Sequence, residues 1–271
     1  MRSNGQKAWL AGVFDRAAPT YDRVGESYHD HFGARLADAA PIESGMSVLD
    51  VACGRGAVLV PAAERVGDAG RVVGVDLSPE MVSRAGEAAS AAGRDACVDV
   101  SVMDAEHLLF ESATFDAALC GFGVFFFPHP DVAVGEMARV VVPGGVVGLS
   151  SWADEDERWA WDDELLADLV VTRRAMSQTF DDAADLERLL VAAGLDDVTS
   201  HPEQHEIVFA TEDQWWEWKW SFSIRGVLEQ VDDASREAYR AAAFDAMRPL
   251  RTSSGFPMRL TALFTLGRKP T

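Results

Sequence analysis

The sequence predicts one α/β domain with a seven-stranded, mostly parallel sheet and helices on both of its faces. From Ser47 onward, short β-branched runs alternate with Ala- and Glu-rich stretches of helical character. The first run, Val48–Ala52, is apolar at nearly every position, as in a strand that is buried on both faces. No internal repeat, low-complexity tract or clear linker divides the 271 residues. We therefore expect a single domain over residues 1–271.

The composition is that of a soluble globular protein with an acidic surface. Hydrophobic residues make up 48% of the chain, and Asp and Glu outnumber Lys and Arg by 44 to 24, a formal net charge of −20. Such a surface repels phosphate backbones and anionic membranes, so we expect neither as a partner. The first residues lead into no apolar segment of a secretory signal, and the longest uncharged runs are too short to span a bilayer. A cytoplasmic protein is expected.

Cysteine usage predicts neither a disulfide nor a metal site. Cys53, Cys97 and Cys120 have no CxxC spacing and lie in apolar stretches, which is typical of buried free thiols in a reducing compartment. No His or second Cys stands at ligand spacing, so we expect no metal.

The first half of the chain supplies five strands and the helices between them. Ser78 and Pro79 provide an N-cap and a first-turn proline for one of these helices, and Pro143-Gly144-Gly145 forms the turn before the fifth strand. The predicted strands are Val48–Ala52, Arg71–Asp76, Cys97–Met103, Phe115–Cys120 and Val146–Ser151. The predicted helices are Ala57–Val66, Ser78 to about Ala92, and Val132–Val140.

Helical additions precede and interrupt the second half of the pattern. Two or three helices are expected before the sheet, and an acidic, Trp-containing stretch after the fifth strand is expected to form helices over the sheet. A second helical insertion precedes the last strand. The helical cap elements lie at about 8–40, 152–178 and 212–251, and between or after them come a helix over Asp182–Ala193, a strand region over Val198–Phe209 and a final strand over Met258–Leu266.

The segment Val48–Gly56 carries the strongest functional signal. A buried strand runs into a loop that contains Gly54 and Gly56 and opens a helix, so that backbone N–H groups can approach a ligand closely. Asp76 stands at the end of the next strand, 22 residues after Gly54, and its carboxylate can accept hydrogen bonds from both hydroxyls of a ribose. The unit therefore predicts a site for an adenosine-containing cofactor.

The loop departs from two well-known nucleotide motifs. Leu59 stands where the dinucleotide fingerprint G-x-G-x-x-G needs its third glycine, and no Gly-Lys-Ser/Thr follows to make a phosphate-binding P-loop. What remains is an acid, a small residue and then Gly-x-Gly. At this point the chain resembles the class I S-adenosylmethionine-dependent methyltransferases, in particular the UbiE-like small-molecule branch. The segments that resemble this family are Asp50–Gly56, Val73–Ser78, Met103–Glu106, Phe115-Asp116 and Arg139–Gly145.

The resemblance implies a Rossmann-like fold whose last strand is antiparallel, and S-adenosylmethionine as cofactor. It places Gly54 and Gly56 against the methionine moiety, Asp76 on the ribose, and Leu77 and Met81 around the adenine. Tyr21 is expected to close over the cofactor carboxylate, although an aromatic residue on a helix also serves in core packing. The full set of expected cofactor-binding residues is Tyr21, Asp50, Ala52, Gly54, Gly56, Asp76, Leu77, Met81, Asp104, Ala105 and Cys120.

Methyl transfer needs a base only where the acceptor arrives protonated and weakly nucleophilic. The candidates are His129, just after the fourth strand, and Tyr21 and His29 before the sheet, although a single histidine is more often an ordinary surface residue. The loop after the fourth strand faces the cofactor in the implied fold, so His129 is expected closest to the methyl group.

Aromatic residues predict a hydrophobic acceptor. Phe122 and Phe126 follow the fourth strand, and Trp215-Trp216-Glu217-Trp218-Lys219-Trp220 places two tryptophan stripes on one helix. We expect one stripe to pack on the sheet and Trp216 and Trp220 to line a pocket, with both stripes in the core as the alternative. Arg225 belongs to a late arginine cluster that binds either an anionic group of the acceptor or neighbouring acids.

The function predicted from the sequence is S-adenosylmethionine-dependent methyl transfer to a hydrophobic, secondary-metabolite-like molecule at carbon, oxygen or nitrogen. The alternatives are an NAD-dependent oxidoreductase of related fold and a non-catalytic cofactor-binding protein. The oligomeric state, a homodimer included, stays open.

Overall fold

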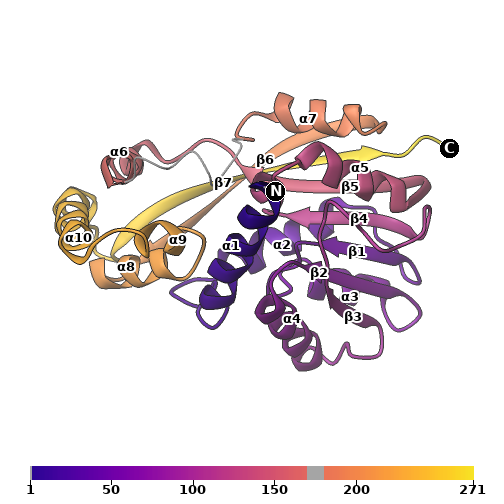
Figure 1. Ribbon diagram of the computed structural model, residues 1–271, viewed down its shortest axis with the longest axis horizontal. Helices are drawn as coiled ribbons and strands as arrows, with labels where there is room; N and C mark the ends of the chain where they lie inside the picture. Colours follow the sequence, from indigo (N-terminus) through magenta and orange to yellow (C-terminus); the bar gives the residue numbers. More distant parts are fainter. Residues whose placement is uncertain (1, 170–179) are drawn as a thin grey trace.

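A seven-stranded sheet forms the centre of the computed structural model, which describes residues 2–169 and 180–271 (Figure 1). The strand order is β3-β2-β1-β4-β5-β7-β6, with the first five strands parallel and β7 antiparallel to both β5 and β6. This confirms the predicted fold class. The strands are β1 Ser47–Val51, β2 Arg71–Asp76, β3 Val98–Val102, β4 Phe115–Gly121, β5 Val141–Trp152, β6 Asp196–Phe209 and β7 Phe256–Arg268.

Helices cover both faces of the sheet. One face packs against α2, α3 and α4, and the other packs against α5 and α7, each through a separate cluster of buried apolar side chains. Burial on both faces explains why β1 reads as a continuous apolar run, with Val48, Leu49 and Val51 buried. These helices are α2 Tyr28–Ala39, α3 Leu59–Val66, α4 Pro79–Ala91, α5 Pro130–Val140 and α7 Ala183–Ala192.

The predicted elements need modest corrections at their ends. Helix α5 begins at Pro130 rather than Val132, since proline at the first helical position needs no hydrogen-bond partner. The expected turn at Pro143-Gly144-Gly145 lies within β5, where the register with β4 shifts. All three cysteines are buried and free, as predicted. In the described residues no helix is long and apolar enough to cross a membrane.

Strand β1 lies at the point where the chain reverses its direction across the sheet. Its neighbours are β2 on one side and β4 on the other. The crossover helices therefore leave β1 and β4 toward opposite faces, which opens a crevice at the carboxyl ends of these strands. The loops after β1, β2 and β4 meet at this crevice.

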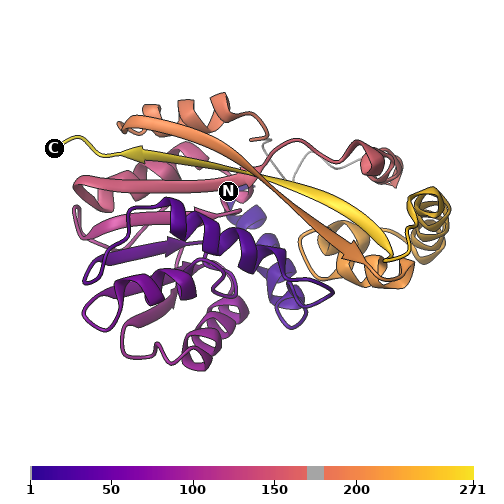
Figure 2. The same ribbon diagram turned by 180° about the vertical axis from the view of Figure 1, so that it is seen from behind.

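The cap lies beyond the sheet rather than over its face. Strands β6 and β7 are 14 and 13 residues long, against five or six residues for β1 and β2, and their extensions form an antiparallel ribbon that carries the cap helices at its far end (Figures 1 and 2). The predicted insertion at 152–178 lies in part outside the described residues. The cap helices are α6 Ala160–Leu169, α8 Glu212–Trp220, α9 Arg225–Leu228 and α10 Asp233–Met247.

A buried polar contact joins three cap helices. Lys219 of α8 pairs with Asp162 of α6, and the hydroxyl of Tyr239 in α10 donates to Asp162 at 2.5 Å. The Lys219 ammonium also lies 5.2 Å from the ring centre of Trp215. Because a buried charge is tolerated only when it is paired, this network fixes how the helices pack.

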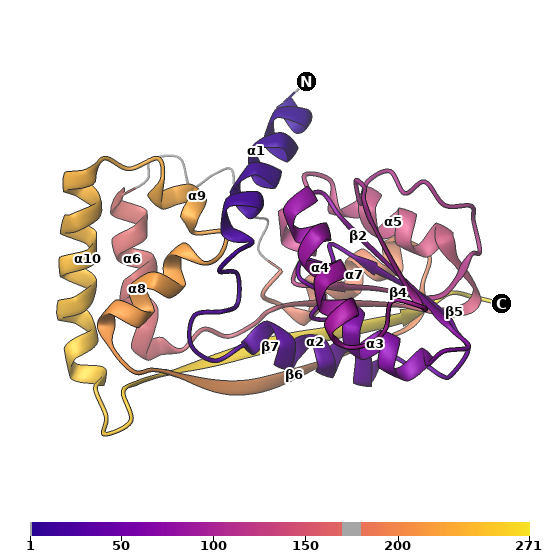
Figure 3. The same cartoon turned by 90° about the horizontal axis from the view of Figure 1, so that it is seen from below.

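Helix α1, Arg2–Ala17, stands between the cap and the sheet (Figure 3). Trp9 and Val13 pack so closely on Gly226 of α9 that a Cβ atom there would lie 2.9 Å from each side chain. Arg16 pairs with Glu229 at the same end. The helix is thereby attached to the cap, while Lys7 and Phe14 on its other side line the crevice.

Gly33 provides a test of how closely α2 packs on the loop before α3. A Cβ at this buried position would lie 2.3 Å from the carbonyl oxygen of Ala57. Gly33→Ala should therefore lower the free energy of unfolding by about 1–3 kcal/mol in chemical denaturation. Gly135→Ala in α5 is the control, because nothing lies within 4 Å of the added methyl group. It should leave stability unchanged or raise it by up to about 1 kcal/mol, and equal losses in both variants would contradict the packing.

Candidate active site

The loop after β1 takes the backbone conformations that its sequence predicts. Gly54 and Gly56 have φ values of 53° and 96°, in the left-handed region that favours glycine, and Ala52 adopts a φ of 57° without that advantage. The Gly54 N–H donates to Asp76 Oδ2 at 2.9 Å, and the Ser78 N–H donates to Asp76 Oδ1 at the same distance. The carboxylate of Asp76 therefore links the loop to the start of α4.

Two carboxyl groups lie against this loop, Asp76 at the wall of the crevice and Asp50 buried beneath the loop. Burial raises the pKa of Asp76, while backbone hydrogen bonds from Ser78, Gly54 and Leu77 act in the opposite direction. Burial and the neighbouring charge of Asp76 raise the pKa of Asp50 well above its ordinary value. Asp50 is 1% exposed and supports the loop from below rather than lining the crevice.

The crevice contains a first cavity that brings most of the predicted cofactor residues together. The loop after β1, the end of β2 with the start of α4, and the loop after β3 each contribute to its wall. The predicted residues that line it are Tyr21, Ala52, Gly54, Asp76, Leu77, Met81, Asp104 and Ala105. Asp50, Gly56 and Cys120 do not line it; Gly56 packs toward α4, and Cys120 is fully buried in β4.

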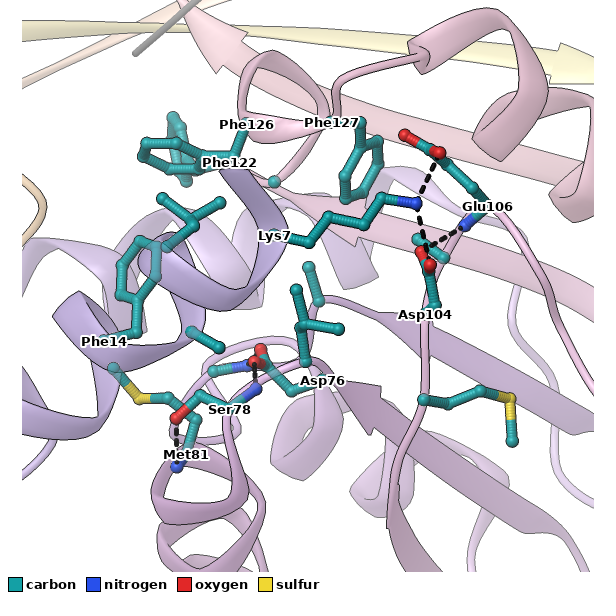
Figure 4. Close-up of a pocket in the computed structure, with 18 of the residues that line it drawn as sticks. Lys7, Phe14, Asp76, Ser78, Met81, Asp104, Glu106, Phe122, Phe126 and Phe127 are labelled. Atoms are coloured by element: carbon teal, nitrogen blue, oxygen red, sulfur yellow. Dashed lines mark hydrogen bonds and ion pairs between the residues drawn. The ribbon is translucent and has the colours of Figure 1, made fainter. Parts of the chain in front are cut away.

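Helix α1 supplies residues of this cavity that sequence reasoning did not identify. Lys7 crosses the cavity, and its Nζ atom lies 2.7 Å from Asp104 Oδ2 and 2.5 Å from Glu106 Oε2 (Figure 4). Phe14 lines the cavity from the same helix. The free space is only about 90 Å³, well below the 300–1,000 Å³ of ordinary ligand pockets. Lys7 therefore fills part of the cavity and pairs with one oxygen of Asp104, whose other oxygen accepts from the Glu106 N–H at 3.0 Å.

A second, larger cavity of about 630 Å³ adjoins the first and lies toward the cap. The two cavities share Phe14, Tyr21, Phe122 and Phe126. The rings of Phe122 and Trp152 stack at 4.1 Å between centroids and form part of the wall. The predicted aromatic residues after β4 thus lie at the junction of both cavities.

Tyr21 and His29 meet at this junction together with Asp22. The Tyr21 hydroxyl lies 3.1 Å from His29 Nε2, and Asp22 Oδ1 lies 3.3 Å from His29 Nδ1. Burial works to raise the pKa of Asp22, but contacts with His29 and Ser27 outweigh it and hold that pKa below its ordinary value. Burial, followed by the charges of Asp22 and Asp76, raises the pKa of Tyr21.

His129 lies elsewhere, contrary to the expectation that it sits closest to the methyl group. It caps α5, its backbone N–H donates to Glu106 at 2.8 Å, and its side chain lines neither of the two cavities. The short helix η1, Val124–Phe126, explains this position. It turns the chain after β4 so that Phe122 and Phe126 line the cavities, and His129 lies beyond them.

The tryptophan stripe that lines a cavity is not the one that was expected to do so. Trp218 lines the second cavity, whereas Trp216 and Trp220 do not. Trp216 packs near Tyr239 of α10, at 5.8 Å between ring centroids. Arg225 stacks 5.6 Å from the Trp220 ring centre and lies 3.4 Å from a carboxylate oxygen of Glu229. It therefore pairs with a neighbouring acid, which is the second of the two roles predicted for the arginine cluster.

In the described part of the chain no group of three or more His, Cys, Asp or Glu side chains could hold a metal ion.

Comparison with known proteins assigns the sequence to a family. Residues 48–145 match the model of a methyltransferase domain. Aklanonic acid methyltransferase DauC of Streptomyces sp. (strain C5) is 36% identical over 151 residues, which cover 56% of this chain and 68% of that protein. The chain belongs to the S-adenosylmethionine-dependent methyltransferases.

Two further comparisons define how far the likeness of this methyltransferase extends. Nocamycin O-methyltransferase of Saccharothrix syringae is 39% identical over 138 residues, which cover 51% of this chain and 49% of that protein. The alignment thus spans about half the length of that relative. The YcgJ protein of Bacillus subtilis has the same fold, with a TM-score of 0.62 and 20% identity, over 89% of this chain and 99% of that one.

The residues of the first cavity suit S-adenosylmethionine, the cofactor of this family. The carboxylate of Asp76 keeps acceptor capacity for a ribose hydroxyl beyond its bonds from Gly54 and Ser78. Leu77, Met81 and Ala105 offer apolar surface for an adenine, and Asp104 offers an acceptor for its amino group. When bound, the cofactor supplies an activated methyl group on a cationic sulfur. Lys7 must leave Asp104 before an adenine amino group can take its place.

The methyltransferase should therefore bind its cofactor more tightly without the Lys7 amine. Lys7→Met removes the two ion pairs, together worth about 0.5–1 kcal/mol, so S-adenosylmethionine affinity should rise about two- to fivefold in calorimetry. Arg16→Met is the control, because it removes one positive charge from the far end of the same helix. Weaker binding by Lys7→Met alone would show that Lys7 holds the cofactor instead of competing with it.

Proposed function

We propose that the protein transfers the methyl group of S-adenosylmethionine to a hydrophobic, aromatic small molecule that binds in the second cavity. The observation that carries this proposal is the shared wall of the two cavities, formed by Phe14, Tyr21, Phe122 and Phe126. A cofactor in the first cavity and an acceptor in the second would meet at this wall. Holding two reactants in such a geometry lowers a reaction barrier by roughly 7–11 kcal/mol.

The second cavity suits an acceptor with aromatic rings. Tyr28, Phe122, Trp152, Trp218 and Phe222 all contribute ring surface to it. Flat rings can stack on such walls with centroid separations of 4.5–7 Å. A volume of about 630 Å³ accommodates a molecule of several fused rings. Trp216, Trp220 and Arg225 are not part of this proposed acceptor site.

Oxygen is the acceptor atom that we favour over carbon and nitrogen. Nocamycin O-methyltransferase, named for transfer to oxygen, matches about half of this chain. The polar side chains of the second cavity, among them Tyr21, His29 and Ser151, can hydrogen-bond a hydroxyl group. Nucleic acid and membrane lipid form no part of the proposal, given the net charge of −20.

The proposed cofactor roles follow the sequence assignment where the structure brings the residues together. Asp76 would hold the ribose, Leu77 and Met81 the adenine ring, and Asp104 with Ala105 its edge. Tyr21 would close over the methionine end. Gly56 and Asp50 would shape the loop without contacting the cofactor. Cys120, buried in β4, would support the floor of the crevice.

Asp76→Ala tests the cofactor site. The variant loses the acceptor for the ribose hydroxyls and both hydrogen bonds that hold the loop, so calorimetry should show S-adenosylmethionine affinity reduced by tenfold or more, about 1.4 kcal/mol. Asp68→Ala, in the exposed loop before β2, is the matched loss of one carboxylate and should bind as the wild type does. Equal affinity in all three proteins would contradict the proposed site.

Filling the second cavity tests the acceptor site separately. Ser223 lines only that cavity, so Ser223→Trp should lower methylation of an aromatic acceptor by more than tenfold while S-adenosylmethionine affinity stays within twofold of wild type. The measurement is transfer of label from S-adenosylmethionine to a panel of hydroxylated aromatic and isoprenoid metabolites. Undiminished transfer by this variant would place the acceptor elsewhere.

A further inference from the structure

We propose that Tyr21, His29 and Asp22 form a proton relay, and that the acceptor group it serves is a neutral hydroxyl, a phenol or an enol, rather than a carboxylate or an amine. This inference rests on the proposed function and names its substrate class. It is carried by the order of three side chains at the junction of the two cavities and by the charge of the second cavity.

The three side chains form a chain of contacts that runs from the cavities inward. The Tyr21 hydroxyl lies 3.1 Å from His29 Nε2, and His29 Nδ1 lies 3.3 Å from Asp22 Oδ1. The His29 Nδ1 and Asp22 Oδ1 atoms approach each other at ion-pair distance, and neither atom makes a hydrogen bond within the described part of the chain. The other oxygen of Asp22 accepts from the Ser27 hydroxyl, which holds the carboxylate in place.

This order fixes the direction in which a proton can move. An ionised Asp22 facing Nδ1 favours the neutral imidazole that carries its hydrogen on Nδ1, which leaves the Nε2 lone pair free to accept. The Tyr21 hydroxyl can therefore donate to Nε2 while its oxygen accepts from a group in the cavity. The side chains of Asp22 and His29 are 7% and 11% exposed, so water competes little for these contacts.

Tyr21 is suited to pass a proton on rather than to keep the charge. It lines both cavities, whereas His29 lines only the second, so the Tyr21 hydroxyl stands nearest to the place where cofactor and acceptor would meet. Burial raises the pKa of Tyr21, which keeps its hydroxyl protonated between transfers. His29 then holds the proton, and Asp22 stabilises the resulting imidazolium.

The groups that face His29 leave the imidazole as the available base. His29 packs against the aromatic rings of Tyr28, Phe122 and Trp152, which carry no charge. Arg23, Asp30 and Arg55 line the hollow on the far side of Tyr21, Asp22 and His29. Asp22 is the only described carboxylate within ion-pair distance of the ring.

The charge of the second cavity selects among acceptors. Its acidic lining residues are Asp154, Glu155, Asp181 and Asp182, and no Lys or Arg stands among the described residues that line it. A carboxylic acid would arrive ionised, would be repelled by Asp154, Asp181 and Asp182, and would need no base. A phenol or an enol arrives neutral and becomes a strong nucleophile only as its proton leaves. The relay would accept that proton.

Methylation of a phenol would move one methyl group and two protons. The acceptor oxygen bonds to the methyl group of S-adenosylmethionine as its own proton passes to the Tyr21 oxygen and the Tyr21 proton passes to His29 Nε2. The electron pair of the broken carbon–sulfur bond stays on sulfur, which leaves S-adenosylhomocysteine, a methyl ether and a protonated His29. Solvent takes this proton after the product leaves.

The relay is tested by His29→Gln and Asp22→Asn, with His31→Gln as the matched control. His31 is on the same helix but stacks on His205, away from both cavities. Asn tolerates the φ of 53° at position 22, so Asp22→Asn keeps the backbone. His29→Gln should lower kcat for a phenolic acceptor at least 100-fold and Asp22→Asn about tenfold or more, with S-adenosylmethionine affinity within threefold of wild type in both.

Two further readouts separate a relay from a merely structural role. The wild-type rate should rise with pH as the base of the relay loses its proton, and this rise should vanish in His29→Gln. Nitrogen chemical shifts of the His29 ring in the cofactor-free protein should report the Nδ1–H form, and Asp22→Asn should change this signature. A ring protonated on Nε2, or a kcat of His29→Gln equal to that of His31→Gln, overturns the relay.

The acceptor panel decides the substrate class and distinguishes the two proposals. Label on the oxygen of phenols or enols supports the inference, whereas label only on carboxylates or amines overturns it and leaves methyl transfer intact. A wild-type protein that binds S-adenosylmethionine yet labels no acceptor of any class overturns the proposed function itself.

Discussion

The carboxylate of Asp76 holds together the two sides of the cofactor crevice. Its two oxygens accept from Gly54 in the loop after β1 and from Ser78 at the start of α4, each at 2.9 Å. Hydrogen bonds to an ionised group are stronger than those between neutral groups, so this pair sets the separation between loop and helix. Ala52 and Leu77 line the first cavity from these two sides. The shape of the cavity, and through the shared wall that of its neighbour, depends on this one side chain.

The sequence allowed prediction of the parts of the fold that depend on local pattern. Apolar runs, caps and turn residues predicted the strands and the sheet, because a strand buried on both faces has a composition of its own. Asp76 and Gly54 could be paired from spacing alone, since a βαβ crossover brings them together. The cap helices were expected over the sheet, because the composition of a strand does not show how far it extends beyond its neighbours. Strands β6 and β7 extend past the other strands and carry the cap helices beyond the end of the sheet.

The site was predictable where it lies on the sheet and not where distant elements meet. Lys7 reaches Asp104 across 97 positions of sequence, and a lysine on an amphipathic helix gives no sign of such a partner. His129 was favoured over His29 because it follows β4, but the turn of η1 carries it past the cavities. The signal that could have ranked His29 first was its spacing from Tyr21, eight residues earlier, with an acid between them.

Helix α1 connects the two cavities mechanically. Lys7 and Phe14 are seven residues apart, about two turns, so both lie on the same side of the helix. Lys7 fills the first cavity, and Phe14 lines both. A shift of the helix that withdraws Lys7 from Asp104 would therefore also move Phe14, a wall of the second cavity. Arg16 and Trp9 attach the same helix to the cap, so such a shift would be transmitted to the cap as well.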